Sequence, residues 1–194
     1  MQTLLRRLAA LGIALAALFS LFPCQTHAVS TSASSAILMD VDSGRVLYEQ
    51  NADAKMLIAS TTKILTALVA IREGDLNDVV TVSREAAYTE GSSMYLKVGE
   101  KLTLETLLYG LLLCSGNDAA VAIAEHISGS QEDFAKLMNA TAREIGMEHS
   151  SFANPNGLDH EDHYSTARDM ARRWKMRLWY GWPPPAASPL AGGP

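Results

Sequence analysis

Ser60 and Lys63 are the residues whose types and spacing best suit covalent chemistry. They stand three apart at the start of a predicted helix over 61–72, so their side chains lie on one helical face. The helix is apolar almost all round, which predicts that Lys63 is buried and that its pKa is lowered. An un-ionised amine beside Ser60 can take the hydroxyl proton and make the oxygen a nucleophile. The alternative is a capping serine followed by a surface lysine.

A second polar motif, Ser115-Gly116-Asn117, interrupts the helical pattern between predicted helices at 104–113 and 118–127. A hydroxyl and an amide placed at such a break can project into a cleft. The same residues are also common N-caps, so the motif alone leaves both interpretations open. The two motifs lie 55 residues apart, each at a predicted helix start.

Two other parts of the sequence contain side chains of reactive or metal-binding types. Residues 160–163 (HEDH), with Asp159, contain metal-ligand types but lack the His-Glu-x-x-His order, so we interpret them as a solvated loop. Cys114 follows three leucines and is predicted to be a small buried hydrophobic residue. The sequence therefore predicts neither a metal nor a cofactor.

The ends of the 194-residue chain differ from its centre. Residues 1–28 have a basic start, an apolar run of about 15 residues and a small-residue cleavage site, which predicts a removed signal peptide and an exported protein. The alternative is an uncleaved membrane anchor; no other anchor is evident. The net charge is −5, and the sequence has no basic stripe of the kind that nucleic-acid binding requires.

Residues 172–194 are predicted to be an anomalous tail. They hold all three tryptophans and five of the seven prolines, and no acidic residue follows Asp169. The change occurs inside a well-started helix, so our hypothesis is that a frameshift near codon 172 introduced an unrelated sequence. The predicted domain is therefore 29–171.

The elements expected within this domain are a hairpin followed by a mainly helical block. Turn residues separate two strand-like segments, and capping residues mark the helix starts. The predicted strands are 35–40, 45–49 and 79–82, and the helices 61–72, 104–113, 118–127, 131–145 and one starting at the 166–169 capping box.

Two segments carry a resemblance to a known family. Residues 59–63 (ASTTK) and 108–120 (LYGLLLCSGNDAA) resemble the first two active-site motifs of the low-molecular-weight penicillin-binding proteins, the serine-type D-alanyl-D-alanine carboxypeptidases. The segments 36–49, 91–103, 154–157 and 164–169 resemble the same family. The resemblance spans the predicted domain and implies an α/β (α+β) fold of the penicillin-binding-protein and β-lactamase type.

The resemblance also implies a role for each site residue. Ser60 would attack a peptidoglycan stem peptide ending in D-Ala-D-Ala, with Lys63 as the general base. Ser115 would pass the proton to the departing D-Ala, and Asn117 would bind the substrate and help to hold Lys63. Penicillins would acylate the same serine. The chain would then be a hydrolase of cell-wall biogenesis.

One departure from the family concerns the third motif, because Lys-Thr-Gly does not occur in this sequence. In the family this strand lines the active site, so we expect an incomplete domain, mostly its helical part and the N-terminal hairpin. Two alternatives remain open at this point. The chain is an inactive fragment of such an enzyme, or it is a serine β-lactamase, although that family's commonest class carries Asp where Gly116 stands.

Overall fold

The structure is a computed structural model and describes residues 31–172. From Ala33 onward these residues belong to one compact unit. The predicted signal peptide, and the predicted tail beyond residue 172, lie outside the described residues. None of the helices in the described part is long and apolar enough to cross a membrane.

The unit opens with the predicted hairpin. Strands β1 (Ala36–Met39) and β2 (Val46–Gln50) pair antiparallel, with an irregularity between Leu38 and Met39. The turn between them is closed by the Asp40 amide, which donates to the Arg45 carbonyl at 2.8 Å. The turn sequence thus produces the connection that its residue types predicted.

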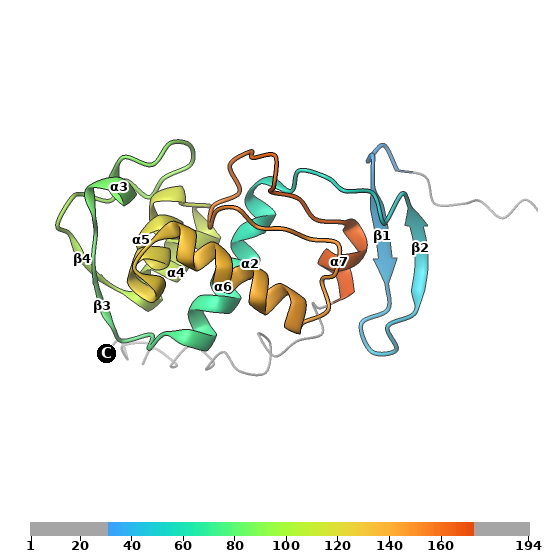
Figure 1. The fold of residues 1–194 in the computed structure, drawn as a ribbon, viewed down its shortest axis with the longest axis horizontal. Helices are drawn as coiled ribbons and strands as arrows, with labels where there is room; N and C mark the ends of the chain where they lie inside the picture. Colours follow the sequence, from blue (N-terminus) through green and yellow to red (C-terminus); the bar gives the residue numbers. More distant parts are fainter. Residues whose placement is uncertain (1–30, 173–194) are drawn as a thin grey trace, which may run out of the picture. The chain divides into compact units, whose positions relative to one another are not determined.

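A helical block follows and forms the core (Figure 1). It contains the short 3₁₀ turn η1 (Ala59–Thr61) and helices α2 (Thr62–Glu73), α4 (Leu104–Leu113), α5 (Asn117–Ser128) and α6 (Gln131–Glu144). Helix α5 contacts α2, α4 and α6. Its six residues 119–124 are all at most 1% exposed, because a helix surrounded on several faces needs apolar residues on each of them.

A second, small sheet was only half predicted. Strand β3 (Val79–Thr81) pairs antiparallel with β4 (Lys101–Thr103), a segment that is not among the predicted strands. The strand was missed because three residues with one apolar side chain carry no alternation to recognise. Between the strands lies the four-residue helix α3 (Arg84–Ala87), also unpredicted, whose N-cap Ser83 accepts a hydrogen bond from the Ala86 amide.

The predicted helix caps are confirmed. Thr103 accepts a hydrogen bond from the Thr106 amide at 3.2 Å, and Ser130 accepts one from the Asp133 amide at 3.0 Å. Each bond satisfies a backbone donor that the first helical turn cannot pair internally.

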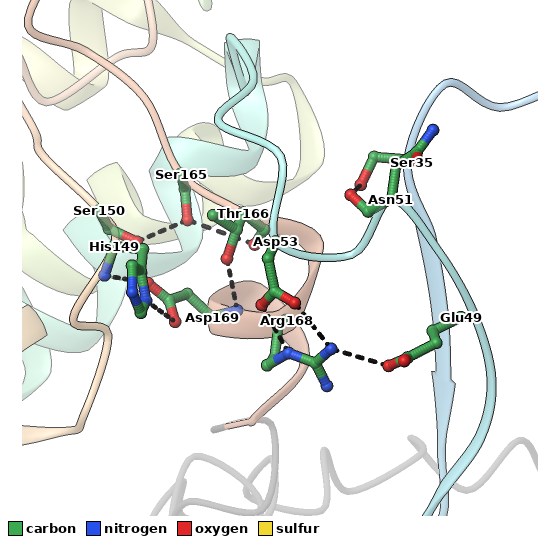
Figure 2. Close-up of polar contacts among 10 residues, drawn as sticks. All are labelled: Ser35, Glu49, Asn51, Asp53, His149, Ser150, Ser165, Thr166, Arg168 and Asp169. Atoms are coloured by element: carbon green, nitrogen blue, oxygen red, sulfur yellow. Dashed lines mark hydrogen bonds and ion pairs between the residues drawn. The ribbon is translucent and has the colours of Figure 1, made fainter.

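Helix α7 (Ala167–Arg172) begins at the predicted 166–169 capping box, where Thr166 Oγ1 accepts from the Asp169 amide at 3.0 Å. Figure 2 shows how Arg168 on this helix reaches two other segments. Its guanidinium contacts both carboxylate oxygens of Asp53, at 2.6 and 2.9 Å, and Glu49 of β2 at 2.8 Å. The family-like stretch 164–169 therefore ties the end of the described chain to the hairpin.

Candidate active site

The Ser60 hydroxyl and the Lys63 amine meet at the start of α2. Lys63 Nζ lies 3.2 Å from Ser60 Oγ, as the three-residue spacing predicted. Ser60 is exposed, whereas Lys63 is 2% exposed. An accessible hydroxyl in contact with a buried amine is the arrangement that nucleophilic catalysis needs.

Burial changes the acidity of Lys63. Removal of the ammonium group from water lowers the pKa of Lys63 to about 8. A substantial fraction of the amine is therefore neutral near pH 7–8 and can accept a proton. The alternative of a surface lysine is wrong, and Ser60 is not a cap either, because the N-cap of α2 is Thr61 and makes no side-chain capping bond.

The turn at 154–157 contacts α2 at Lys63 and one helical turn further on. The Asn156 carbonyl accepts a hydrogen bond from Lys63 Nζ at 2.8 Å, and the Pro155 carbonyl accepts one from Thr66 Oγ1 at 2.6 Å. Two successive carbonyls thus receive donors from positions 63 and 66, one turn apart on α2. The segment 154–157 resembles the family in sequence, but its residue types do not indicate that its backbone contacts Lys63.

Both motifs contain a residue in the left-handed backbone region. Ala59, directly before the nucleophile, has φ +45°, and Ser115 has φ +54°. Residues other than glycine adopt this region at a cost of about 1–3 kcal/mol, and such strain concentrates at functional sites. The surrounding contacts must therefore hold both backbone segments in place.

The Ser115-Gly116-Asn117 motif forms the predicted break between two helices. Helix α4 ends at Leu113, and Gly116 is the N-cap of α5 without a side-chain capping bond, so the capping interpretation of Ser115 and Asn117 is wrong. The Asn117 amide nitrogen Nδ2 donates to the Glu90 carbonyl at 2.6 Å, and its backbone amide donates to the Ser92 carbonyl at 2.7 Å. The segment 90–92 therefore fixes the orientation of Asn117.

The two motifs are not joined by a hydrogen bond in the described part of the chain. Helix α5 contacts α2, but among residues 31–172 no hydrogen bond joins Ser115 or Asn117 to Ser60 or Lys63. Lys63 is held by the Asn156 carbonyl, and the Asn117 amide is directed to Glu90 instead. The role that the resemblance assigns to Asn117 at Lys63 therefore stays a prediction.

Asp118 is a buried carboxylate that the sequence did not single out. It is 0% exposed and accepts hydrogen bonds from the Ser93 hydroxyl at 2.6 Å and from the backbone amides of Met94, Leu96 and Ala119 at 2.9–3.1 Å. Burial works to raise the pKa of Asp118, but these four hydrogen bonds together lower it. The carboxylate therefore anchors the segment 93–96 beside Asn117.

Replacing Asp118 with alanine is expected to lower the free energy of unfolding by about 3 kcal/mol, because buried donors lose their only acceptor. Urea unfolding followed by circular dichroism measures this loss. Glu105→Ala is the matched control, since Glu105 is an exposed acidic residue in the first turn of α4. Equal effects of the two substitutions would contradict the assigned role.

Two predictions about other candidate residues are wrong. His163, assigned to a solvated loop, is 1% exposed and hydrogen-bonds to Thr62 Oγ1, whereas residues 159–162 are exposed. Cys114, predicted to be buried, is exposed. No cluster of three metal-ligand side chains occurs within residues 31–172.

Comparisons with known proteins agree with this geometry. The family model described as D-alanyl-D-alanine carboxypeptidase (peptidase S11) matches residues 23–178. The chain is 44% identical over 161 residues to D-alanyl-D-alanine carboxypeptidase DacF of Bacillus subtilis, covering 80% of this chain and 41% of that protein. It is also 44% identical over 156 residues to DacC of Escherichia coli, covering 75% and 39%.

Solved structures give the same result. The DacD carboxypeptidase of Francisella tularensis superposes with a TM-score of 0.74 at 38% identity, over 76% of this chain and 37% of that one. A D-alanyl-D-alanine carboxypeptidase of Mycobacterium tuberculosis gives 0.74 at 35%, over 79% and 58%. These neighbours confirm the penicillin-binding-protein fold class, of which the chain spans only part.

The chain spans about two fifths of the length of these two curated relatives. Its described residues place Ser60 against the buried Lys63, and they place the second motif in a polar break between two helices, as the first two family motifs predicted. The match extends over most of the sequence and includes both motifs. The chain therefore belongs to the D-alanyl-D-alanine carboxypeptidase family of serine peptidases.

Proposed function

We propose that the chain removes the terminal D-Ala from peptidoglycan stem peptides through an acyl-enzyme on Ser60. Ser60 Oγ forms an ester bond with the carbonyl carbon of the penultimate D-Ala, and the peptide C–N bond breaks. Lys63 accepts the hydroxyl proton, and Ser115 helps to deliver a proton to the departing amine. Water then hydrolyses the ester. Penicillins acylate the same oxygen.

The observation that carries this proposal is the state of Lys63. The amine lies 3.2 Å from an exposed serine hydroxyl, and its pKa is lowered to about 8 by burial. A general base is most effective when its pKa lies near the working pH. A buried lysine with no described carboxylate partner is costly for folding, which favours a catalytic role over a structural one.

Asn117 is proposed to bind the substrate peptide. Its Nδ2 is used by the Glu90 carbonyl, whereas none of the hydrogen bonds described for residues 31–172 is accepted by its Oδ1. That oxygen is available for a substrate amide. Gly91, with φ +95°, lies so close that an added Cβ would sit 2.5 Å from Asn117 Nδ2, so the segment leaves the side chain little room to turn away.

The proposed place of action is the cell envelope. The substrate is part of the cell wall, and residues 1–28 have the pattern of a signal peptide. Cell-wall biogenesis, maintenance of cell shape and inhibition by β-lactam antibiotics follow from the same proposal.

A labelled penicillin tests this function. The purified chain, residues 29–194, is incubated with fluorescent penicillin, and the modified peptide is identified by mass spectrometry. The expected result is one adduct per chain, on the peptide that contains Ser60. Absence of any adduct on a cooperatively folded chain would contradict the proposal. Rapid turnover of penicillin in place of a long-lived adduct would indicate a β-lactamase.

A further inference from the structure

His163 is a buried histidine with a hydrogen bond at each ring nitrogen. Nε2 lies 2.7 Å from Thr62 Oγ1 on α2, and Nδ1 accepts the backbone amide of Ala153 at 3.1 Å. The ring also packs edge-on against Phe152, with the ring centroids 5.7 Å apart. The side chain thus connects the catalytic helix to the segment that leads into the 154–157 turn.

The Ala153 amide determines the tautomer of the ring. A backbone N–H can only donate, so Nδ1 must be unprotonated and the ring proton of neutral His163 must be on Nε2. Nε2 then donates to Thr62 Oγ1. Burial lowers the pKa of His163, the charge of His160 acts in the same direction, and Asp159 opposes both. The ring is therefore neutral at pH 7.

The two partners of His163 belong to the two segments that carry Lys63 and its carbonyl acceptor. Thr62 stands between Ser60 and Lys63 in the sequence, and Ala153 lies three residues before Asn156, whose carbonyl holds Lys63. Beside the hydrogen bonds of Lys63 and Thr66, the ring is thus a further link between the helix that carries the reactive groups and the turn that covers them.

The base of this turn is fixed independently of His163. Ser151 and Tyr164 form a bridge of two backbone hydrogen bonds, at 2.8 and 2.9 Å. Ser150 contacts both Ser165 and the buried carboxylate of Asp169, at 2.7 and 2.8 Å (Figure 2). The backbone bridge does not use the His163 ring, so the base of the loop should keep its place when His163 is changed, whereas its far side loses one of its contacts with α2.

We propose that His163 is a positioning residue whose neutral Nε2–H ring holds the 153–157 turn on α2, so that the Asn156 carbonyl stays on Lys63. Protonation of Nδ1 would place two donors, the ring N–H and the Ala153 N–H, against each other and release the turn. The charged groups that act on the ring are Asp159 and His160 on its own loop. The catalytic consequence rests on the proposed function, but the positioning itself does not.

The direct test is the acidity of Lys63, followed by nuclear magnetic resonance of lysine labelled at Cε and assigned with Lys63→Met. In the unmodified chain the pKa of Lys63 is expected at about 8. In His163→Phe, which keeps the ring volume but neither hydrogen bond, water reaches Lys63 and its pKa is expected to rise by about one unit or more. His160→Phe is the matched control, since His160 is exposed, and should leave Lys63 unchanged.

Two further measurements distinguish positioning from general stability. His163→Gln retains a donor and an acceptor, so it should return the Lys63 pKa most of the way to about 8. Nitrogen-15 shifts of the unmodified chain should show His163 protonated on Nε2 at pH 7. An unchanged Lys63 pKa in folded His163→Phe, or a proton on Nδ1, would overturn the proposal. The shift measurement decides the matter if His163→Phe does not fold.

The consequence for catalysis is tested by the acylation of Ser60 by penicillin. Below the pKa of Lys63, protonation of the amine alone slows acylation. Below the pKa of His163, which is lower, protonation of the ring should slow it further. The logarithm of the rate should therefore steepen from slope one to slope two in acid, and His163→Gln should keep slope one. If the unmodified chain is not acylated at all, the proposed function fails, whereas the Lys63 titration still decides the role of His163.

Discussion

Lys63→Met is expected to lower the rate of acylation of Ser60 by penicillin by about 10³-fold, because the hydroxyl loses its proton acceptor. Methionine fits the site, since it is an unbranched apolar side chain in a position where Lys63 is 2% exposed. The melting temperature is expected to stay the same or rise, because burial of an amine without a charged partner costs folding free energy. A loss of rate without a loss of stability would identify Lys63 as the base.

The pH dependence of the reaction provides a second measure of the same residue. Lys63 accepts a proton only as the neutral amine, and its pKa is about 8. The rate should therefore rise about tenfold per pH unit just below pH 7, more steeply in the acid range where His163 is also protonated, and it should level off above about pH 9. In Lys63→Met this rise should disappear, leaving a slow and nearly pH-independent reaction.

The matched control for both experiments is Lys97→Met, since Lys97 is an exposed lysine on the 97–100 turn. It should leave the rate and its pH profile unchanged. Stopped-flow measurement of acylation between pH 5 and 10 compares the three proteins. If Lys63→Met kept the steep profile of the unmodified chain, another group would be the base.

The contacts of α2 explain which parts of this site could be predicted. The Ser60–Lys63 contact spans three residues, so helical spacing alone was enough to predict it. The caps at Thr103 and Ser130 were likewise predicted from residues within one turn. Such features depend on local backbone geometry, which the residue types determine.

The contacts that hold Lys63 in place have a different origin. The Asn156 carbonyl is 93 residues from Lys63, and His163 is 101 residues from Thr62. A backbone carbonyl has no sequence signature, and a buried histidine looks the same in sequence as the exposed His160. Thr66, the polar residue within the otherwise apolar stretch 64–71, was a signal that could have indicated an acceptor facing α2.

Gly157→Ala is expected to reduce the free energy of unfolding by about 3–5 kcal/mol, the range of substitutions that force a steric clash on strained backbone. Gly157 has φ +90°, and an added Cβ would lie 2.0 Å from the Ala59 carbonyl oxygen and 3.0 Å from Thr62 Oγ1. The atom in the way is backbone, so no side-chain rotation relieves the clash. Either the 154–157 turn or the segment before Ser60 has to move.

Gly129→Ala separates the clash from the backbone strain. Gly129 has φ +79° at the C-cap of α5, and an added Cβ there has no atom within 4 Å. Its substitution should lower the free energy of unfolding by about 1 kcal/mol, which is the effect of placing alanine in the left-handed region without a clash. Urea unfolding measures the loss of unfolding free energy in each variant. The difference between the two losses is the energy of the clash between the added Cβ at position 157 and the Ala59 carbonyl.

The movement forced by Gly157→Ala should also reach the reactive pair. Ala59 precedes Ser60, and Asn156 precedes Gly157, so displacement of either segment separates the Asn156 carbonyl from Lys63 Nζ. Under conditions where Gly157→Ala is still folded, acylation of Ser60 should fall by at least about tenfold, whereas Gly129→Ala should react normally. Equal acylation by both variants would mean that the turn contributes to folding but not to the geometry of the Ser60–Lys63 pair.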